Sequence, residues 1–353
     1  MAQRSFAFFY PPKPTIFSLL QKAQSPATIS PMNPTPNKLF TVACFGNAVV
    51  DAIARVDEKT LEKFNLKKGD GNTLSHAQML ELSNEIEVEQ FRPGGSVANT
   101  AYTLARLGSR TCFIGNIGND PTGRHFAEDM VSAGVTVLPP RQGVRTIEVF
   151  SLITSDGART MVQSEPAPPS TDDAWLEDAM IEQCRCLLLE SYACASYPAA
   201  AEYAAKLAHQ NGALIAISLA TPRAVQASLS TLQSLVIAHQ PLVIGNQKEW
   251  QLLLNSADAH SAAKMEKTPR VITRSGEGAT YYSADGKVVD SPTQAIPKPT
   301  DLSGAGDAFA AGFLHNFIGG GSPNLALAQG HQLGRAVVLQ LGPRLSNPTE
   351  SLH

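Results

Sequence analysis

From Phe40 onward, short apolar runs alternate with longer segments whose apolar residues recur at helical spacing. The apolar runs predict buried strands at 40–45, 112–114, 186–189, 213–218, 242–245 and 270–273. Helical spacing, with glycine at several ends, predicts helices over 96–108, 123–134 and 199–209. Because strand and helix alternate, the pattern indicates an α/β fold with a parallel sheet covered by helices on both faces.

One segment departs from this alternation. Residues 146–163 alternate between apolar and polar positions and contain the turn sequence Ser155-Asp-Gly-Ala, which predicts a β-hairpin. A hairpin is antiparallel and does not fit into the parallel sheet. We therefore expect a small added sheet that serves as a lid.

The first 36 residues differ from the rest, since they carry seven prolines and no acidic residue. Such a stretch has little to bury and many helix breaks, which predicts disorder. Two interpretations stay open: an organelle-targeting segment, or a start assigned too early with Met32 as the true first residue. Residues 37–353 are expected to form one domain.

Composition narrows the class of protein. The 353 residues carry 28 Lys and Arg against 31 Asp and Glu, with 43% hydrophobic residues, which is typical of a globular chain. The net charge of −3 gives no general electrostatic reason to bind nucleic acid or an anionic membrane. No apolar run reaches the ~18 residues of a membrane helix. The odd number of cysteines, 5, indicates reduced thiols and a cytoplasmic protein, unless the leader targets an organelle.

The strongest chemical signal is the segment Asp301-Leu-Ser-Gly-Ala-Gly-Asp307, which runs directly into an apolar helix. The small residues Gly304, Ala305 and Gly306 leave backbone N–H groups uncovered at a helix N-terminus, which suits an anion. A carboxylate beside such a site can take a proton from an attacking hydroxyl in phosphoryl transfer. The alternative is that Asp307 only caps the helix.

A second signal is Arg92-Pro-Gly-Gly-Ser-Val-Ala-Asn99. Two adjacent glycines before a helix let the backbone approach a ligand closely. Asn99, one turn into the helix, offers both a donor and an acceptor. By itself, such a pair of glycines more often marks only an ordinary turn.

Together, the two segments resemble the two signatures of the ribokinase-like (PfkB) kinases, in the same order and at a similar separation. The similarity runs from about Phe40 to about Pro343. It implies a Rossmann-like, three-layer α/β/α domain with a mostly parallel central sheet and a small β-sheet lid. Lid strands are then expected near 52–57, 86–92 and 145–164. The implied reaction is ATP-dependent phosphorylation of a primary alcohol on a sugar or nucleoside.

The resemblance also implies roles for individual residues. Asp307 would be the base, and the anion hole would consist of Gly304, Ala305 and Gly306. The acceptor's hydroxyls would be bound by Asp51, Gly94, Gly95 and Asn99. Arg159, in the second strand of the hairpin, would reach the transferred phosphate; the alternative is a solvated strand residue.

On the nucleotide side, Asn246-Gln-Lys-Glu249 matches the family's Asn-x-x-Glu. Glu249 would organise the water shell of Mg²⁺ and Asn246 the phosphates, whereas a plain helix cap is the alternative. Thr273 and Gly276 would border the ATP. A requirement for a monovalent cation stays open.

Five stretches resemble the adenosine kinase branch more than ribokinase: 46–51, Leu66-Lys-Lys-Gly69, Gly157-Ala-Arg159-Thr-Met161, Leu189-Glu190-Ser-Tyr192 and Gln340-Leu-Gly-Pro-Arg344. Tyr192 would stack on a purine base; the alternative is a packing residue. Adenosine phosphorylation to AMP is therefore the favoured reaction. A kinase of ribose, fructose or a related carbohydrate is the first alternative, and a non-catalytic nucleoside-binding regulator the second. Leu302 departs from the threonine that the family usually has. The expected partner is a small molecule, and the chain is expected to be a monomer or a homodimer.

Overall fold

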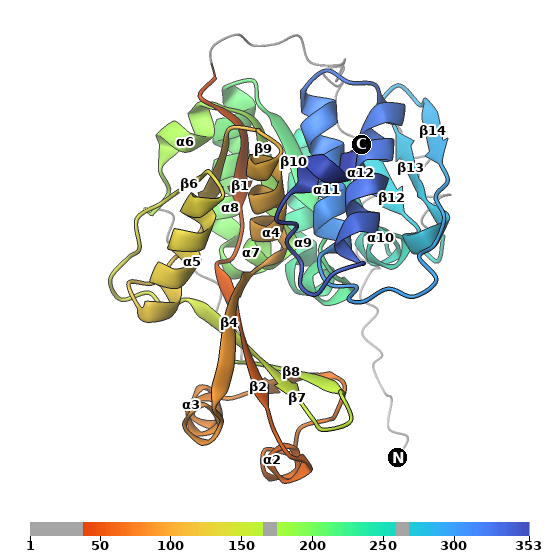
Figure 1. Cartoon of the computed structure of the whole chain (residues 1–353). Coiled ribbons are helices and arrows are strands. Elements are labelled where there is room, and N and C mark those ends of the chain that lie inside the picture. Colours follow the sequence, from red (N-terminus) through yellow and green to blue (C-terminus); the bar gives the residue numbers. More distant parts are fainter. Residues whose placement is uncertain (1–37, 165–174, 259–267, 353) are drawn as a thin grey trace, which may run out of the picture.

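The computed structural model describes residues 38–164, 175–258 and 268–352. The predicted leader, residues 1–36, lies outside these ranges. A large body carries a smaller sheet that projects from it, and the strands β2 (Val49–Arg55) and β4 (Val88–Gly94) run from the body into that sheet (Figure 1). In the part of the chain that is described, no helix is both long and apolar enough to cross a bilayer.

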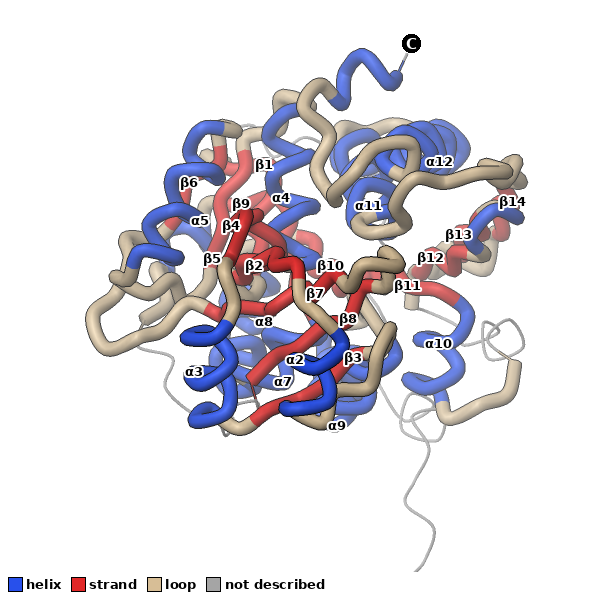
Figure 2. The backbone as a smooth tube through the Cα atoms, turned by 60° about the horizontal axis from the view of Figure 1, so that its bottom comes forward, coloured by secondary structure: helices blue, strands red, loops and turns tan. Residues whose placement is uncertain are grey.

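The body is built on a nine-stranded sheet in the order β14-β13-β12-β11-β10-β9-β1-β5-β6, which Figure 2 shows across the molecule. Its strands are β1 (Phe40–Phe45), β5 (Thr111–Ile114), β6 (Val135–Val137), β9 (Cys184–Glu190), β10 (Leu214–Ser218), β11 (Leu242–Asn246), β12 (Arg270–Thr273), β13 (Ala279–Tyr282) and β14 (Val288–Ser291). All neighbouring strands pair in parallel except at one edge, where β12–β13 and β13–β14 are antiparallel. The predicted fold class is therefore confirmed.

Helices cover both faces of this sheet. One face carries α4 (Ser96–Arg106), α5 (Pro121–Ser132), α11 (Ala305–Ile318) and α12 (Pro323–Val337). The other carries α6 (Asp178–Glu182), α7 (Ser191–Ser196), α8 (Pro198–Gln210), α9 (Pro222–His239) and α10 (Gln247–Leu254). Successive residues of β1 enter different cores, with Val42 and Cys44 on one side and Ala43 and Phe45 on the other. A strand buried on both faces reads as a continuous apolar run, which is the pattern in the sequence.

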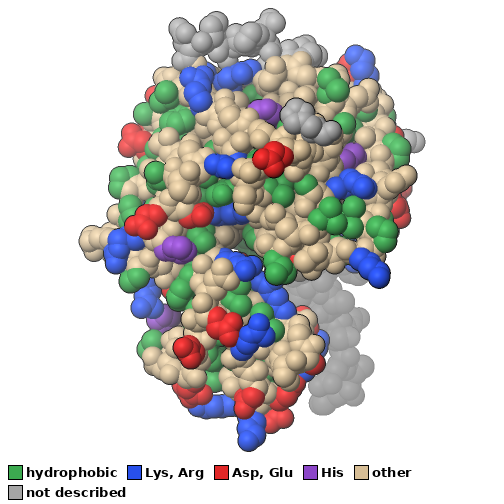
Figure 3. Space-filling model, in the orientation of Figure 1, with side chains coloured by type: hydrophobic (Ala, Val, Ile, Leu, Met, Phe, Trp, Pro, Cys, Tyr) green, Lys and Arg blue, Asp and Glu red, His purple; other side chains and the backbone are tan. Residues whose placement is uncertain are grey.

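The projecting sheet, called the lid below, has five strands in the order β3-β8-β7-β2-β4. They are β2 (Val49–Arg55), β3 (Gly71–Leu74), β4 (Val88–Gly94), β7 (Ile147–Ile153) and β8 (Arg159–Ser164). Two helices, α2 (Glu58–Lys63) and α3 (His76–Glu85), pack on one face of the lid, where they bury a small apolar core. Lysine, arginine and carboxylate side chains are intermixed at the lid's tip (Figure 3).

Strand register places one row of lid residues on the face opposite that core. The pairings Thr73–Gln163, Gln163–Val149, Val149–Asp51 and Asp51–Arg92 join all five strands. Side chains paired in this way project from the same side of a sheet. The row therefore ends in a carboxylate and an arginine on the strands that lead into the body.

At the other end of this row, the body holds the lid through Arg223, in the first turn of α9. Its guanidinium donates to the Thr73 hydroxyl at 3.1 Å. With its amide oxygen turned toward the guanidinium, Gln163 accepts two further hydrogen bonds at 3.1 and 3.0 Å. One body side chain thus contacts two lid strands.

We expect Arg223→Met to loosen the lid, because it removes these hydrogen bonds and keeps the length of the side chain. If the lid covers bound acceptor, the acceptor's KM should rise roughly threefold to tenfold, the scale of one typical net hydrogen bond. Steady-state kinetics would measure this, with Arg124→Met as control, since Arg124 is exposed in α5 (Pro121–Ser132) and donates to Asn119 just before that helix. Equal effects of the two variants would contradict this role of Arg223.

Candidate active site

The two signature segments meet between the N-terminal turns of α4 and α11. Ser96 Oγ donates to one oxygen of the Asp307 carboxylate at 2.6 Å, and Asn99 Nδ2 donates to the other at 3.0 Å. The hydroxyl of Thr100 donates to the Asp307 carbonyl oxygen at 3.2 Å. Residues more than 200 positions apart in the chain are therefore joined at one carboxylate.

The turn that carries Asp307 requires glycine at position 304. Gly304 has a left-handed backbone, with φ of +76°, and no side chain caps the N-terminus of α11. A Cβ atom at this position would lie 2.5 Å from Cβ of Pro343. The first-turn N–H groups, including those of Gly306 and Asp307, are left uncapped by side chains, which suits a bound anion.

Burial changes the proton affinity of the carboxylate. Loss of solvation raises the pKa of Asp307 to about 6, although the hydrogen bonds from Ser96 and Asn99 and the positive charge of Arg344 act in the opposite direction. A carboxylate with a pKa near neutral pH can both exist in its basic form and bind a proton well. Asp307 is therefore suited to act as a general base.

The predicted acceptor residues lie around the same point. A Cβ atom on Gly94 would come within 3.0 Å of Asp51 Oδ2, and one on Gly95 within 2.7 Å of the Asn47 carbonyl oxygen. Gly95 also has a φ of +89°. Burial raises the pKa of Asp51, against the positive charges of nearby arginines. The structure thus brings Asp51, Gly94, Gly95 and Asn99 together with Asp307.

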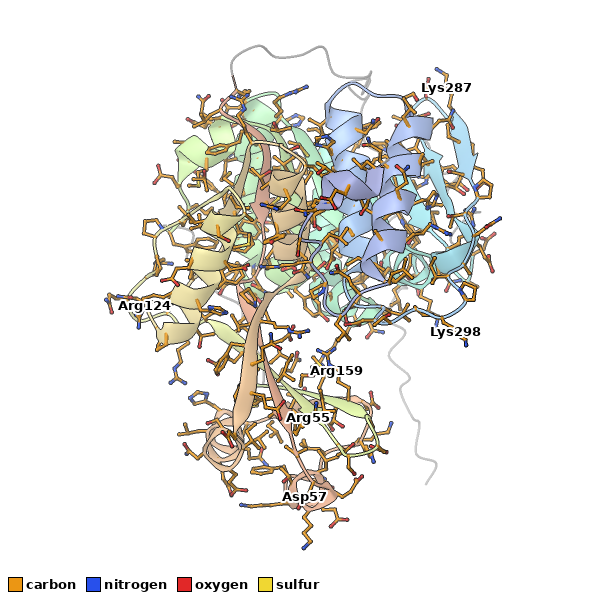
Figure 4. All side chains as sticks on the ribbon, in the orientation of Figure 1. Arg55, Asp57, Arg124, Arg159, Lys287 and Lys298 are labelled. Carbon is orange, nitrogen blue, oxygen red and sulfur yellow. The ribbon has the colours of Figure 1, made fainter. Side chains whose placement is uncertain are left out.

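Arg159 projects from the lid toward the body, as Figure 4 shows. Its Nε donates a hydrogen bond to Ser151 Oγ, and the residue is exposed. Its charge lowers the pKa of both Asp51 and Asp301, although other causes are larger. Arg159 therefore lies within electrostatic reach of both segments.

The nucleotide-side residues lie at the carboxyl ends of β11 and β12, where Asn246 and Thr273 are direct neighbours in the sheet. Asn246 caps α10 with its side chain, and the Glu249 carboxylate accepts hydrogen bonds of 2.8 and 2.6 Å from the backbone N–H and the amide nitrogen of Asn246. The helix-cap alternative is thus realised. Gly276 follows β12 in a turn where a Cβ would lie 2.5 Å from that of Ala295.

Glu249 is the carboxylate that the sequence assigned to Mg²⁺. Among the described residues there is no group of three or more His, Cys, Asp or Glu side chains that could hold a metal. Mg²⁺ often keeps several waters and uses one or two carboxylates with substrate phosphates. Glu249 is 3% exposed, and burial raises its pKa, with a smaller contribution from Asp307. A single carboxylate within electrostatic reach of Asp307 therefore fits a water-mediated Mg²⁺ site.

Sequence reasoning missed Glu190 as a site residue. It is 1% exposed at the end of β9, and its two oxygens accept backbone N–H groups of Asn47 at 2.9 Å and Val97 at 3.0 Å. Burial raises the pKa of Glu190 to about 7. This carboxylate joins the loop after β1 to the N-terminus of α4, where the helix dipole favours a negative charge. A single acid ending an apolar strand was the available signal.

Ser96, Tyr192 and Leu302 lie in or beside the segments described above. Ser96, a ligand of the Asp307 carboxylate, had no sequence signal beyond its position between the glycines and Asn99. Tyr192 shares a 2.8 Å hydrogen bond with Thr221, so its hydroxyl is engaged by the cap of α9. Leu302 is 70% exposed, which places an apolar side chain on the surface beside the turn that precedes α11.

Comparison with known proteins agrees with this geometry. A family model described as pfkB family carbohydrate kinase matches residues 40–350. Adenosine kinase 1 of Arabidopsis thaliana is 24% identical over 302 residues, which cover 78% of this chain and 87% of that protein.

Two solved structures are similar over nearly their whole length. A probable sugar kinase from Rhizobium etli has a TM-score of 0.78 at 25% identity, covering 89% of this chain and 98% of its own. Adenosine kinase from Sinorhizobium meliloti has a TM-score of 0.74 at 28% identity, with the same coverage. The family match spans both signature segments, the lid and the central sheet. The chain therefore belongs to the pfkB family of carbohydrate kinases, and it is a phosphotransferase with an alcohol group as acceptor.

Proposed function

We propose that this protein transfers the phosphoryl group of ATP to the 5′-hydroxyl of a nucleoside, with adenosine as the favoured acceptor and AMP as product. The observation that carries the proposal is the Asp307 carboxylate, with a pKa of about 6, at an uncapped helix N-terminus between two signature segments. The similarity to adenosine kinases supports the choice of acceptor.

In this proposal the acceptor's sugar hydroxyls bind to Asp51, to the amide of Asn99 and to the backbone at Gly94 and Gly95. The primary hydroxyl then points at Asp307, which takes its proton as the oxygen attacks the phosphorus. The N–H groups at Gly304, Ala305 and Gly306 stabilise the charge on the transferred group. In-line transfer needs no covalent intermediate with the protein.

The nucleotide would lie over the turn after β12, beside Thr273 and Gly276. Asn246 and Glu249 would hold the phosphates and the water shell of Mg²⁺, which supplies charge neutralisation when bound. Arg159 would approach the transferred phosphate from the lid. A closed lid excludes water, which would otherwise accept the phosphoryl group.

We expect activity to fall on the acid side of neutrality. Below a pH of about 6, Asp307 becomes protonated and kcat/KM for the acceptor should drop about tenfold per pH unit. The same group makes the free energy of unfolding depend on pH, because Asp307 binds its proton more tightly in the folded state than in the unfolded state. The stabilisation from this group is therefore full below pH 3.8 and lost as the pH rises to about 6.

A pH profile of kcat/KM tests this. Glu190, with a pKa of about 7, is close enough to interact with Asp307, so the profile of Glu190→Gln should be measured beside the wild type. An acid limb with a midpoint near pH 6 that persists in Glu190→Gln supports Asp307 as the general base. Full activity at pH 4.5 would contradict the assignment.

The acceptor is identified by ADP release from Mg-ATP with adenosine, inosine, guanosine, ribose and fructose. Fast turnover with adenosine alone supports the proposal. Preference for ribose or fructose favours the second candidate, a carbohydrate kinase, to which the similarity to the probable sugar kinase lends support. Nucleoside binding without ADP release would indicate a non-catalytic regulator.

We further propose that the protein works in the cytoplasm, as a monomer or a homodimer. The five cysteines are buried and free, and burial raises the pKa of Cys112 and Cys194, which is consistent with unreactive thiols in the cytoplasm. Turnover with and without K⁺ would test the monovalent-cation requirement. Sedimentation would distinguish a monomer from a homodimer.

A further inference from the structure

The segment Gly342-Pro343-Arg344, which follows α12, contacts both signature segments. The N–H of Gly342 donates to Asp301 Oδ2 at 3.0 Å. Pro343 packs so closely on Gly304 that no side chain fits there. The next residue, Arg344, turns toward α4. This C-terminal segment thus forms a third part of the site.

The guanidinium of Arg344 contacts four residues on three different elements, β4, α4 and α5. Its Nε donates to Asn99 Oδ1 at 2.9 Å, and one Nη donates to the Gly94 carbonyl oxygen at 3.3 Å. The other Nη forms an ion pair with Asp129 of α5, in which the arginine side chain is only 10% exposed. The guanidinium carbon also lies 4.9 Å from the centre of the Tyr102 ring. The planar group is therefore held on all its edges and on one face.

These contacts decide which way the amide of Asn99 points. An amide has one accepting and one donating end, and rotation by 180° exchanges them. Since Arg344 only donates, it requires the oxygen of Asn99 on its side. The amide nitrogen is then directed at Asp307 Oδ2. A reversed amide would place its oxygen against the Asp307 carboxylate.

We propose that Arg344 is a positioning residue of the acceptor site, which orients the Asn99 amide toward Asp307 and, through the Gly94 carbonyl, holds the backbone of Gly94 close to Asp51. The inference rests on the proposed roles of Asp307 and Asn99. Arg344 does not touch the acceptor. It decides how firmly the groups that do so are held.

A lysine would not replace this arginine. Its ammonium is a single point and cannot reach Asn99, Gly94 and Asp129 in one plane. It would retain the positive charge, which lowers the pKa of Asp307 and is lost in a methionine variant. The other groups that act on Asp307 come from α4 (Ser96 and Asn99), β9 (Glu190) and α10 (Glu249). Arg344→Lys, which keeps the charge, and Arg344→Met, which does not, therefore separate the hydrogen-bond geometry of the guanidinium from its positive charge.

The experiment compares Arg344→Met and Arg344→Lys with Arg106→Met in the full chain. Arg106 is the matched control because it bonds to Ser346 and Asn347, close behind Arg344, and does not contact Asn99. For each variant we would measure kcat, the KM of acceptor and of ATP, the acceptor's dissociation constant by calorimetry, and kcat/KM against pH.

In Arg344→Met the acceptor's KM and dissociation constant should rise about 10- to 100-fold, the scale of lost hydrogen bonds to a charged group. The KM of ATP should stay within about twofold. The acid limb should move to higher pH in Arg344→Met and stay in place in Arg344→Lys, while both bind the acceptor more weakly. Arg106→Met should behave as the wild type.

Acceptor affinity within twofold of the wild type in Arg344→Lys and Arg344→Met would overturn the inference. An equal loss in Arg106→Met would also overturn it, because Arg344 would then only tether the C-terminal segment. If Arg344→Met does not fold, the acceptor affinity of Arg344→Lys by itself tests the inference. An active wild type with unaffected Arg344 variants contradicts only this inference, whereas a wild type that phosphorylates no acceptor contradicts the proposed function as well.

Discussion

Replacing Asp307 by asparagine is expected to lower kcat by ~10²–10⁴, the scale of a lost general base, while the acceptor still binds. Asparagine has nearly the same shape as aspartate. Its oxygen can accept from Asn99, and its nitrogen can donate to the Ser96 hydroxyl, so both contacts of the native carboxylate have a replacement. Steady-state kinetics and calorimetric binding of the acceptor would measure the two effects separately.

A matched control is Asp178→Asn on α6, whose carboxylate accepts a hydrogen bond from Tyr203 and lies on the opposite face of the sheet. Its kcat should be unchanged. The acid limb of the pH profile should also disappear in Asp307→Asn. An Asp307→Asn enzyme with wild-type kcat would remove this residue from the role of base.

Substituting Gly304 by alanine should be nearly as damaging. An L-residue at a φ of +76° costs about 1–2 kcal/mol, and the new Cβ would lie 2.5 Å from Cβ of Pro343 and 2.7 Å from its Cα. Relief of that overlap must displace the turn that presents the N–H groups. Loss of one such donor typically lowers kcat by ~10²–10³. We therefore expect a loss of that size, together with a lower Tm.

Gly320→Ala controls for backbone strain alone. Gly320 follows the other end of α11, has a φ of +89°, and its added Cβ would have no atom within 4 Å. Its free energy of unfolding should fall by the strain of about 1–2 kcal/mol, which lowers its Tm, and its kcat should stay within about twofold of the wild type. Similar kcat values for the two variants would show that the crowding of Gly304 by Pro343 has no catalytic consequence.

Much of the body could be predicted from local pattern. The apolar runs ending at Phe45, Leu189 and Gly245 are strands, because a strand buried on both faces must be apolar throughout. The helices after Gly95 and before Gly134 were equally clear from spacing and terminal glycines. Periodicity reports such elements because burial on one or both sides constrains each residue separately.

Other elements were not predicted. The lid strand β3 (Gly71–Leu74) has only one buried residue, and α2 and α3 carry few buried positions, so their apolar pattern is weak. The antiparallel strands β13 and β14 extend the central sheet at its edge, where β14 is largely exposed. The edge strand β14 buries little apolar surface and therefore leaves little trace in the sequence, whereas β13 is mostly buried but only four residues long.

The sequence by itself determined the chemistry of the candidate site: a carboxylate after small residues, a pair of glycines before an amide, and a strand-alternating body. These features depend on neighbours along the chain. Only the tertiary structure decided how they act together. It directed the Asn99 oxygen to Arg344, 245 positions away, and left its nitrogen for Asp307. It also placed the buried Glu190 beneath the first helix turn. Hydrogen bonds across such separations depend on how helices pack on the sheet, which no local pattern records.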